Sequence, residues 1–149
     1  MTNNQQSELR VVEISQPVLE KEHPLPAFLS PVQAGFPSPA EDYIENHLDL
    51  NGLVVQRPAA TFFVRVEGES MADANIHSGD ILVVDRSIQA SNGKIVVAII
   101  NGEFTVKRFI LKNGGAYLLP ENPKFPVIKV EAGADFQVWG VVTYVIHKT

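Results

Sequence analysis

The sequence predicts a mainly β domain of antiparallel strands, with one short N-terminal helix and an extended N-terminal arm. Beyond residue 60, apolar side chains recur at every second position, which is the period of a half-buried strand. Asn-Gly pairs separate these segments and favour the positive φ angles of tight hairpin turns. Strands do not alternate with helices, so a parallel sheet is not expected. A chain of 149 residues suits a single domain around one core.

The arm is predicted from the distribution of proline. The first 39 residues hold six of the ten prolines. Proline fixes its own φ, restricts the residue before it and cannot donate a backbone hydrogen bond. Residues 1–39 are therefore expected to form a flexible, extended arm, and residues 40–149 the folded domain.

The helix is predicted at the start of that domain. Ser38-Pro39-Ala40-Glu41 is a capping-box pattern, in which the Ser38 hydroxyl accepts from the Glu41 N–H and proline takes the first helical position. Apolar residues at helical spacing follow, namely Tyr43, Ile44 and Leu48. We expect a short helix from about residue 39 to residue 48, with Asn51-Gly52 ending the element.

The strands are predicted from segments rich in Val, Ile, Phe and Tyr. These segments are Thr61–Glu67, Ile81–Asp85, Lys94–Ile100, Glu103–Leu111, Ala116–Leu119 and Phe136–His147. The clearest unit is a hairpin in which Asn101-Gly102 forms a two-residue turn between the third and fourth segments.

Composition excludes several classes of function. The formal net charge is −5, from 12 basic and 17 acidic side chains, with no basic cluster, so direct DNA binding is not expected. The longest apolar run, 95–100, is far too short to span a membrane, and the first residues do not resemble a signal peptide. We therefore expect a cytoplasmic protein.

Metal and cofactor sites find no support in the sequence. The chain has no cysteine, which removes disulfides, thiolate nucleophiles and thiolate metal ligands. No His-x-x-x-His pair, clustered acidic loop or glycine-rich phosphate loop is present. We expect neither a metal nor a cofactor.

Ser70 is the first candidate for chemistry. It lies in Gly68-Glu69-Ser70-Met71, just past a predicted strand, where its hydroxyl can be exposed and its own N–H offered to an oxyanion. Serine after glycine is more often turn chemistry, and the motif is not the Gly-x-Ser-x-Gly elbow, because Ala72 replaces the second glycine. A Ser-His-Asp triad would need His77, with Asp73 or Asp80 to orient it, but such residues are common in polar loops.

Lys107 is the better candidate for the base. It lies in the largely apolar segment Glu103–Leu111, where alternation puts Thr105 and Lys107 on one face and Val106 on the other. Desolvation among apolar neighbours would lower the pKa of Lys107 and free a lone pair near neutral pH. An isolated lysine is more commonly a side chain that extends to solvent from a strand edge, so the segment alone does not decide its role.

Taken together, these pieces resemble the UmuD family, which are LexA-like self-cleaving serine/lysine peptidases. The resemblance runs in order from about Gln33 to the C-terminus, whereas residues 1–24 match no part of the pattern. It rests on Ala34–Ala40 as the cleavage segment, Gly68–Met71 as the nucleophile motif, Ser78–Asp80 as the following turn, Gly102–Arg108 as the strand of the base lysine, and Phe136–Val142.

The resemblance implies a LexA/signal-peptidase-like β domain that cuts its own arm between Ala34 and Gly35. Ser70 would attack the Ala34 carbonyl, neutral Lys107 would accept and then deliver the proton, and the Ser70 N–H would help to hold the oxyanion. It also implies a RecA filament on single-stranded DNA as the trigger. The trimmed form would be a homodimer that joins an error-prone, UmuC-type translesion polymerase in the SOS response.

Three other functions compete with this one. A LexA- or phage-type repressor needs a helix-turn-helix, for which the proline-rich residues before Ala34 are too short and too broken. A signal peptidase needs a membrane anchor, and the sequence offers no apolar segment long enough. A non-catalytic β domain that binds partners through its arm, with Ser70 and Lys107 merely structural, stays open.

Overall fold

A computed structural model describes residues 7–18 and 48–149 and confirms the mainly β prediction. Its helices and strands are β1 (Arg10–Ser15), α1 (Leu50–Val54), η3 (Pro58–Ala60), β2 (Thr61–Glu67), η4 (Ala72–Ala74), β3 (Ile81–Asp85), β4 (Ile95–Ile100), β5 (Glu103–Lys112), β6 (Gly115–Leu119), β7 (Ile128–Val130) and β8 (Phe136–Ile146). Over this part of the chain the strands form one antiparallel sheet in the order β1-β2-β3-β8-β4-β5-β6-β7.

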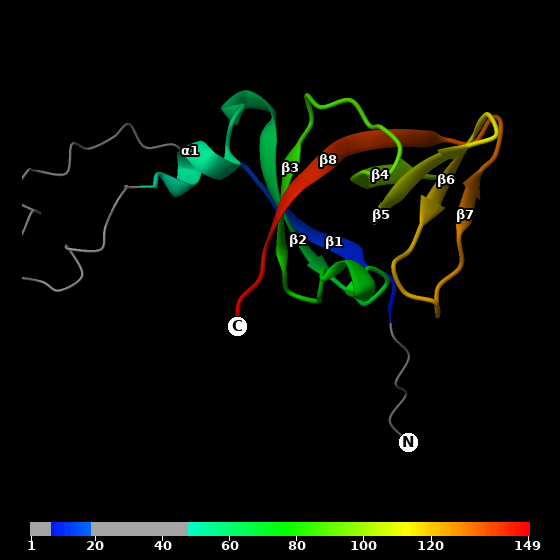
Figure 1. Ribbon diagram of the computed structural model, residues 1–149, viewed down its shortest axis with the longest axis horizontal. Coiled ribbons are helices and arrows are strands. Elements are labelled where there is room, and N and C mark those ends of the chain that lie inside the picture. Colours follow the sequence, from blue (N-terminus) through cyan, green and yellow to red (C-terminus); the bar gives the residue numbers. More distant parts are fainter. Residues whose placement is uncertain (1–6, 19–47) are drawn as a thin grey trace, which may run out of the picture.

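The sheet is curled. β1 and β5 are separated in the sheet by β2, β3, β8 and β4, yet they are in contact. Figure 1 shows the long β8 crossing the molecule, with α1 at one end and the β5–β6–β7 hairpins at the other. The curl brings the end of β2 and the middle of β5 to the same place, where the candidate site lies.

The predicted hairpin is confirmed. Ile100 of β4 pairs with Glu103 of β5, so Asn101 and Gly102 form the two-residue turn. Their φ angles are 51° and 81°, the left-handed region that both central residues of this turn type need. This turn sets the register that pairs Val96 with Lys107.

β1 was not predicted from the sequence, which assigned its residues to the flexible arm. It pairs antiparallel with β2, from Arg10 opposite Glu67 to Ser15 opposite Phe63. Its residues precede Pro17, the first proline, so every backbone N–H is available to the ladder. Leu9, just before the strand, is only 1% exposed and belongs to the core.

The predicted end of the helix, at Asn51-Gly52, is wrong. Nearly all of the expected helix 39–48 lies outside the described residues, and the short helix seen is Leu50–Val54. Asn51-Gly52 therefore lies inside a helix and does not end one. The reason is local, because the Asp49 carboxylate accepts a hydrogen bond from the Asn51 N–H at 3.1 Å and caps the helix start.

Two hydrophobic clusters pack on the sheet. The first contains the buried residues Leu9, Val64, Val66, Met71, Ile76, Leu82, Val84, Val97 and Val106. The second contains Val96, Ala98, Phe109, Leu118 and Val141. The candidate site borders the first cluster.

Candidate active site

Ser70 lies in the turn between β2 and η4 and is fully buried. Gly68 opens this turn with a φ of 121°, which a residue with a side chain rarely adopts. A distant loop braces the turn, because the Ser70 carbonyl accepts from the Glu121 N–H at 2.9 Å and the Glu69 carbonyl accepts from the Asn122 side chain at 2.9 Å. The hydroxyl is thus held at a fixed place.

Lys107 reaches Ser70 from the middle of β5. Its side chain is fully buried, and Nζ donates to Ser70 Oγ at 3.3 Å and to Thr105 Oγ1 at 2.8 Å. Nζ also forms an ion pair with Glu8 Oε2 at 2.7 Å. These three acceptors match the three N–H groups of an ammonium.

Burial lowers the pKa of Lys107 below its ordinary value of 10.5, and the hydrogen bond and charge of Glu8 act in the opposite direction. Desolvation is the larger effect. A lysine in this setting gives up its proton more easily than one in water, as the sequence argument expected.

Sequence reasoning missed three contacts of the pair. Thr105 was placed on the face of Lys107, but its hydrogen bond to Nζ was not predicted, although the i, i+2 spacing on a strand carried that signal. Glu8 and Leu9 come from far away in the sequence, and no local pattern points to them. Leu9 donates its N–H to Ser70 Oγ at 2.9 Å.

The cleavage-site residues and the alternative base His77 have different outcomes. Ala34 and Gly35 lie outside the described residues. The His77 N–H donates to Asp80 Oδ2, and Asp80 Oδ1 contacts His147 Nδ1. In the described part of the chain no hydrogen bond joins His77 to Ser70, so the geometry favours lysine over the triad.

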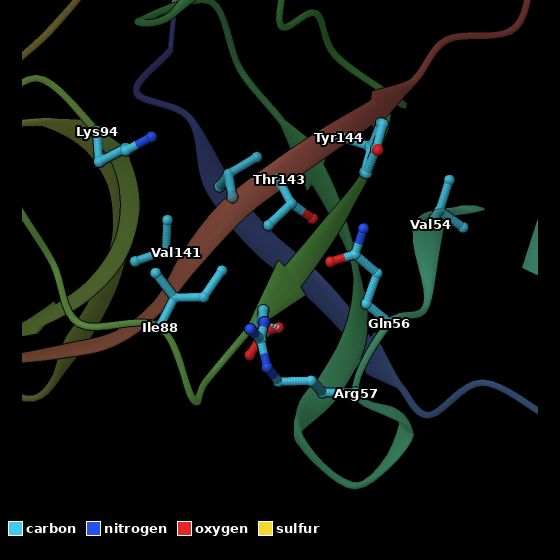
Figure 2. Close-up of a pocket in the computed structure, with 10 residues that line it drawn as sticks. Val54, Gln56, Arg57, Ile88, Lys94, Val141, Thr143 and Tyr144 are labelled. Carbon is cyan, nitrogen blue, oxygen red and sulfur yellow. Dashed lines mark hydrogen bonds and ion pairs between the residues drawn. The ribbon is translucent and has the colours of Figure 1, made fainter. Parts of the chain in front are cut away.

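A separate pocket of about 290 Å³ lies away from Ser70 and Lys107. Figure 2 shows Val54 and Arg57 on one side of it and Thr143 and Tyr144 of β8 on another. Asp85 in this pocket is fully engaged. Burial raises its pKa, but hydrogen bonds from the Ser87 hydroxyl and N–H and from Arg57 outweigh that effect and lower it. Asp85 therefore has a structural role in this pocket, where its carboxylate joins Arg57 to Ser87.

Residues 7–18 and 48–149 show no feature of a metal site or of a membrane-spanning helix. Within these ranges no group of three or more His, Cys, Asp or Glu side chains could hold a metal ion. No described helix has the length and apolar character needed to cross a bilayer.

Comparison with known proteins identifies the domain. Residues 26–143 match the Peptidase S24-like family. Protein SamA of Salmonella typhimurium is 52% identical over 124 residues, covering 83% of this chain and 86% of SamA. Protein MucA of Escherichia coli is 49% identical over 123 residues, covering 82% and 84%.

A more distant relative is a repressor of which the match covers only about half. The LexA repressor of Paracidovorax citrulli is 38% identical over 118 residues, which are 79% of this chain but only 52% of the repressor. The matches to SamA and MucA, by contrast, cover most of this chain and most of each relative. The predicted resemblance is confirmed, and the chain belongs to the Peptidase S24-like family, in its UmuD group.

Proposed function

We propose that this protein cleaves its own chain between Ala34 and Gly35, with Ser70 as nucleophile and Lys107 as base. The observation that carries the proposal is the buried 3.3 Å hydrogen bond between Lys107 Nζ and Ser70 Oγ. The two residues are far apart in the sequence and share no secondary-structure element. A buried lysine within reach of a serine hydroxyl is the arrangement that activates a serine without histidine.

The reaction begins when Lys107 loses its proton. Neutral Nζ takes the proton of Ser70 as Oγ attacks the Ala34 carbonyl carbon, and the Ser70 N–H and a neighbouring amide stabilise the oxyanion. The same proton then passes to the Gly35 nitrogen as the peptide bond breaks, and water hydrolyses the acyl enzyme. Thr105 orients Nζ, since its hydroxyl fixes one of the ammonium directions.

The trimmed chain is proposed to act in the SOS response, in the cytoplasm. There it would be a homodimer and an accessory subunit of a UmuC-type translesion polymerase, with a RecA filament on single-stranded DNA triggering cleavage. Its membership of the UmuD group supports this role. Removal of residues 1–34 leaves 10 basic and 13 acidic side chains, a net charge of −3, so the polymerase would supply the contact with DNA.

The test of the chemistry is a mass measurement. The purified protein, incubated at high concentration and alkaline pH, should yield a product of 115 residues (149 − 34). Ser70→Ala and Lys107→Ala should each abolish this product, and His77→Ala should cleave like the parent. Loss of cleavage in His77→Ala with Lys107→Ala still active would overturn the dyad, and no product from the parent would favour a non-catalytic binding domain.

The test of the biological role bypasses cleavage. A chain that begins at Gly35 and carries Ser70→Ala should support damage-induced mutagenesis beside its cognate polymerase, whereas full-length Ser70→Ala should not. The measurement is mutation frequency after DNA damage in cells that lack the native gene. If the trimmed Ser70→Ala form is as inactive as the full-length one, cleavage is not the activating step.

A further inference from the structure

The segment that leads into β1 covers the Ser70–Lys107 pair. Leu9 donates its N–H to Ser70 Oγ at 2.9 Å, and the neighbouring Glu8 carboxylate binds Lys107 Nζ at 2.7 Å. One dipeptide therefore occupies both groups on which the chemistry depends. β1 pairs with β2 (Figure 1), and its first residue, Arg10, lies opposite Glu67, the last residue of β2 before the turn that contains Ser70.

This segment binds as an added strand. The Glu69 N–H donates to the Ser7 carbonyl at 2.8 Å, and the pairing continues along the β2 edge from Arg10 to Ser15. Addition of an extended peptide to an exposed sheet edge is a common mode of peptide recognition, in which the backbone provides affinity and alternate side chains provide specificity. The edge of β2 beside the dyad is thus a site for an extended peptide.

The site is shaped to receive this peptide closely. Leu9 is buried within the first hydrophobic cluster, so it acts as the apolar anchor. Gly68 leaves room for the backbone, because a Cβ at that position would lie 2.1 Å from the Glu8 carbonyl oxygen. Such contact is possible only where the wall of the site is glycine.

The bound segment is not in a reactive position. A hydrogen bond from the Leu9 N–H holds Oγ near the plane of the Glu8–Leu9 peptide, whereas nucleophilic attack requires an approach above the carbonyl carbon. Lys107 donates to three acceptors, which is the pattern of an ammonium with no free lone pair. The strand is held like a substrate but is not set up for cleavage.

We propose that residues 7–15 are a built-in competitive inhibitor, which must leave the β2 edge before the Ala34–Gly35 segment can reach Ser70. The proposal rests on the self-cleavage proposed above. Both segments are tethered to the same domain, so the cleavage rate is reduced by the fraction of time that residues 7–15 occupy the site. These residues precede residue 26, where the match to the family begins.

The first test weakens the anchor of the inhibitor in the full-length chain. Leu9→Ala should speed self-cleavage about tenfold, which corresponds to ~1.4 kcal/mol of lost binding. Leu111→Ala is the matched control, since Leu111 is 52% exposed and lies at the far end of β5. An unchanged or slower rate in Leu9→Ala would mean that the segment does not inhibit cleavage, and the inhibitor role would be wrong.

The second test uses the charge of Glu8. The groups in contact with Lys107 Nζ are Glu8 before β1, Thr105 on β5 and Ser70 after β2, and among the described residues Glu8 is the charged one. Glu8→Gln should therefore lower the pKa of Lys107 and move the rise of the pH–rate profile to lower pH. A profile that stays in place would show that Glu8 does not act on the base.

The third test locks the inhibitor in place. The chain has no cysteine, so Glu13→Cys with Arg65→Cys introduces one defined pair at residues that are opposite each other on β1 and β2. The oxidised form should cleave at least about tenfold more slowly than the reduced form, again ~1.4 kcal/mol. The control is Tyr117→Cys with Lys129→Cys across β6 and β7, whose rate should not depend on oxidation.

The masses of the products distinguish the possible failures. If neither the parent nor any variant forms product at alkaline pH, the proposed self-cleavage fails and the inhibitor role fails with it. If all forms yield the 115-residue product at equal rates, the dyad stands and the inhibitor is wrong. A product of 141 residues (149 − 8) would show that Glu8–Leu9 is a substrate, which also overturns the proposal.

Discussion

The two hydrophobic clusters of the sheet differ in where their residues come from. The cluster beside Ser70 takes Leu9 from the N-terminal segment, together with residues of β2, β3, β4 and β5. The buried members of the second cluster all lie between Val96 and Val141. One half of the core therefore depends on the N-terminal segment, and the other half does not.

This difference in origin predicts which part of the core the proposed cleavage would change. Loss of residues 1–34 would remove Leu9 from the first cluster and nothing from the second. Burial of a leucine side chain contributes about 1.5–3 kcal/mol, so its departure uncovers an apolar site next to the dyad at a moderate cost. The second cluster would keep the sheet folded in both forms.

The largest effect on stability is expected in the second cluster. Leu118 is fully buried there, so Leu118→Ala should lower the free energy of unfolding by about 2–5 kcal/mol. The loss should be equal in the full-length chain and in a chain that begins at Gly35. Denaturant unfolding of both forms measures it, and a much smaller loss in one form would show that the clusters are not independent.

Leu9→Ala should have a smaller effect on stability, and only the full-length chain contains this residue. Because β1 is an edge strand, it can detach without unfolding the sheet, so the change should cost about 2 kcal/mol. Hydrogen exchange of the β1 and β2 amides at neutral pH should report faster local opening, with the β5–β6 amides unchanged. Equal acceleration in both regions would contradict a local role for Leu9.

Lys107→Met should remove a pH dependence of stability. The pKa of Lys107 is lowered in the folded state, so between that pKa and 10.5 the unfolded chain binds more protons and stability rises with pH. The stability gained from neutral Lys107 is fully present above pH 10.5 and is lost as pH falls through the folded-state pKa.

The measurement is the difference in unfolding free energy between parent and Lys107→Met at pH 7 and pH 10. The change between pH 7 and pH 10 should be larger when both chains also carry Glu8→Gln, because Glu8 raises the pKa of Lys107 and the covering segment stays in place. A difference that does not vary with pH would contradict a desolvated lysine.

The smallest effect is expected from the exposed ion pair that borders the first cluster. Arg10 and Glu67 are 3.4 Å apart, with side chains 68% and 50% exposed, so Arg10→Ala should change the unfolding free energy by well under ~1 kcal/mol. Chemical denaturation at low and high salt checks this value. A loss comparable to that of Leu9→Ala would mean that charge, and not the apolar anchor, holds β1.

The sequence by itself determined the strands from residue 61 onward. Segments rich in Val, Ile, Phe and Tyr predicted β2 and β3 with their observed bounds, and Asn101-Gly102 predicted the β4–β5 hairpin, because both signals act between neighbouring residues. The short strand Ile128–Val130 was missed, since three residues carry too little periodicity. The candidate residues Ser70 and Lys107 were also visible in the sequence, each on its own element.

Only the tertiary structure decided what surrounds those two residues. The curl of the sheet brings Lys107 of β5 to the turn after β2, and the pairing of β1 with β2 places Glu8 and Leu9 on the same site. These contacts join residues separated by 37, 61 and 99 positions, so no local pattern could encode them. A segment that composition alone assigns to a flexible arm becomes a strand because an unpaired sheet edge and an apolar pocket are available to it.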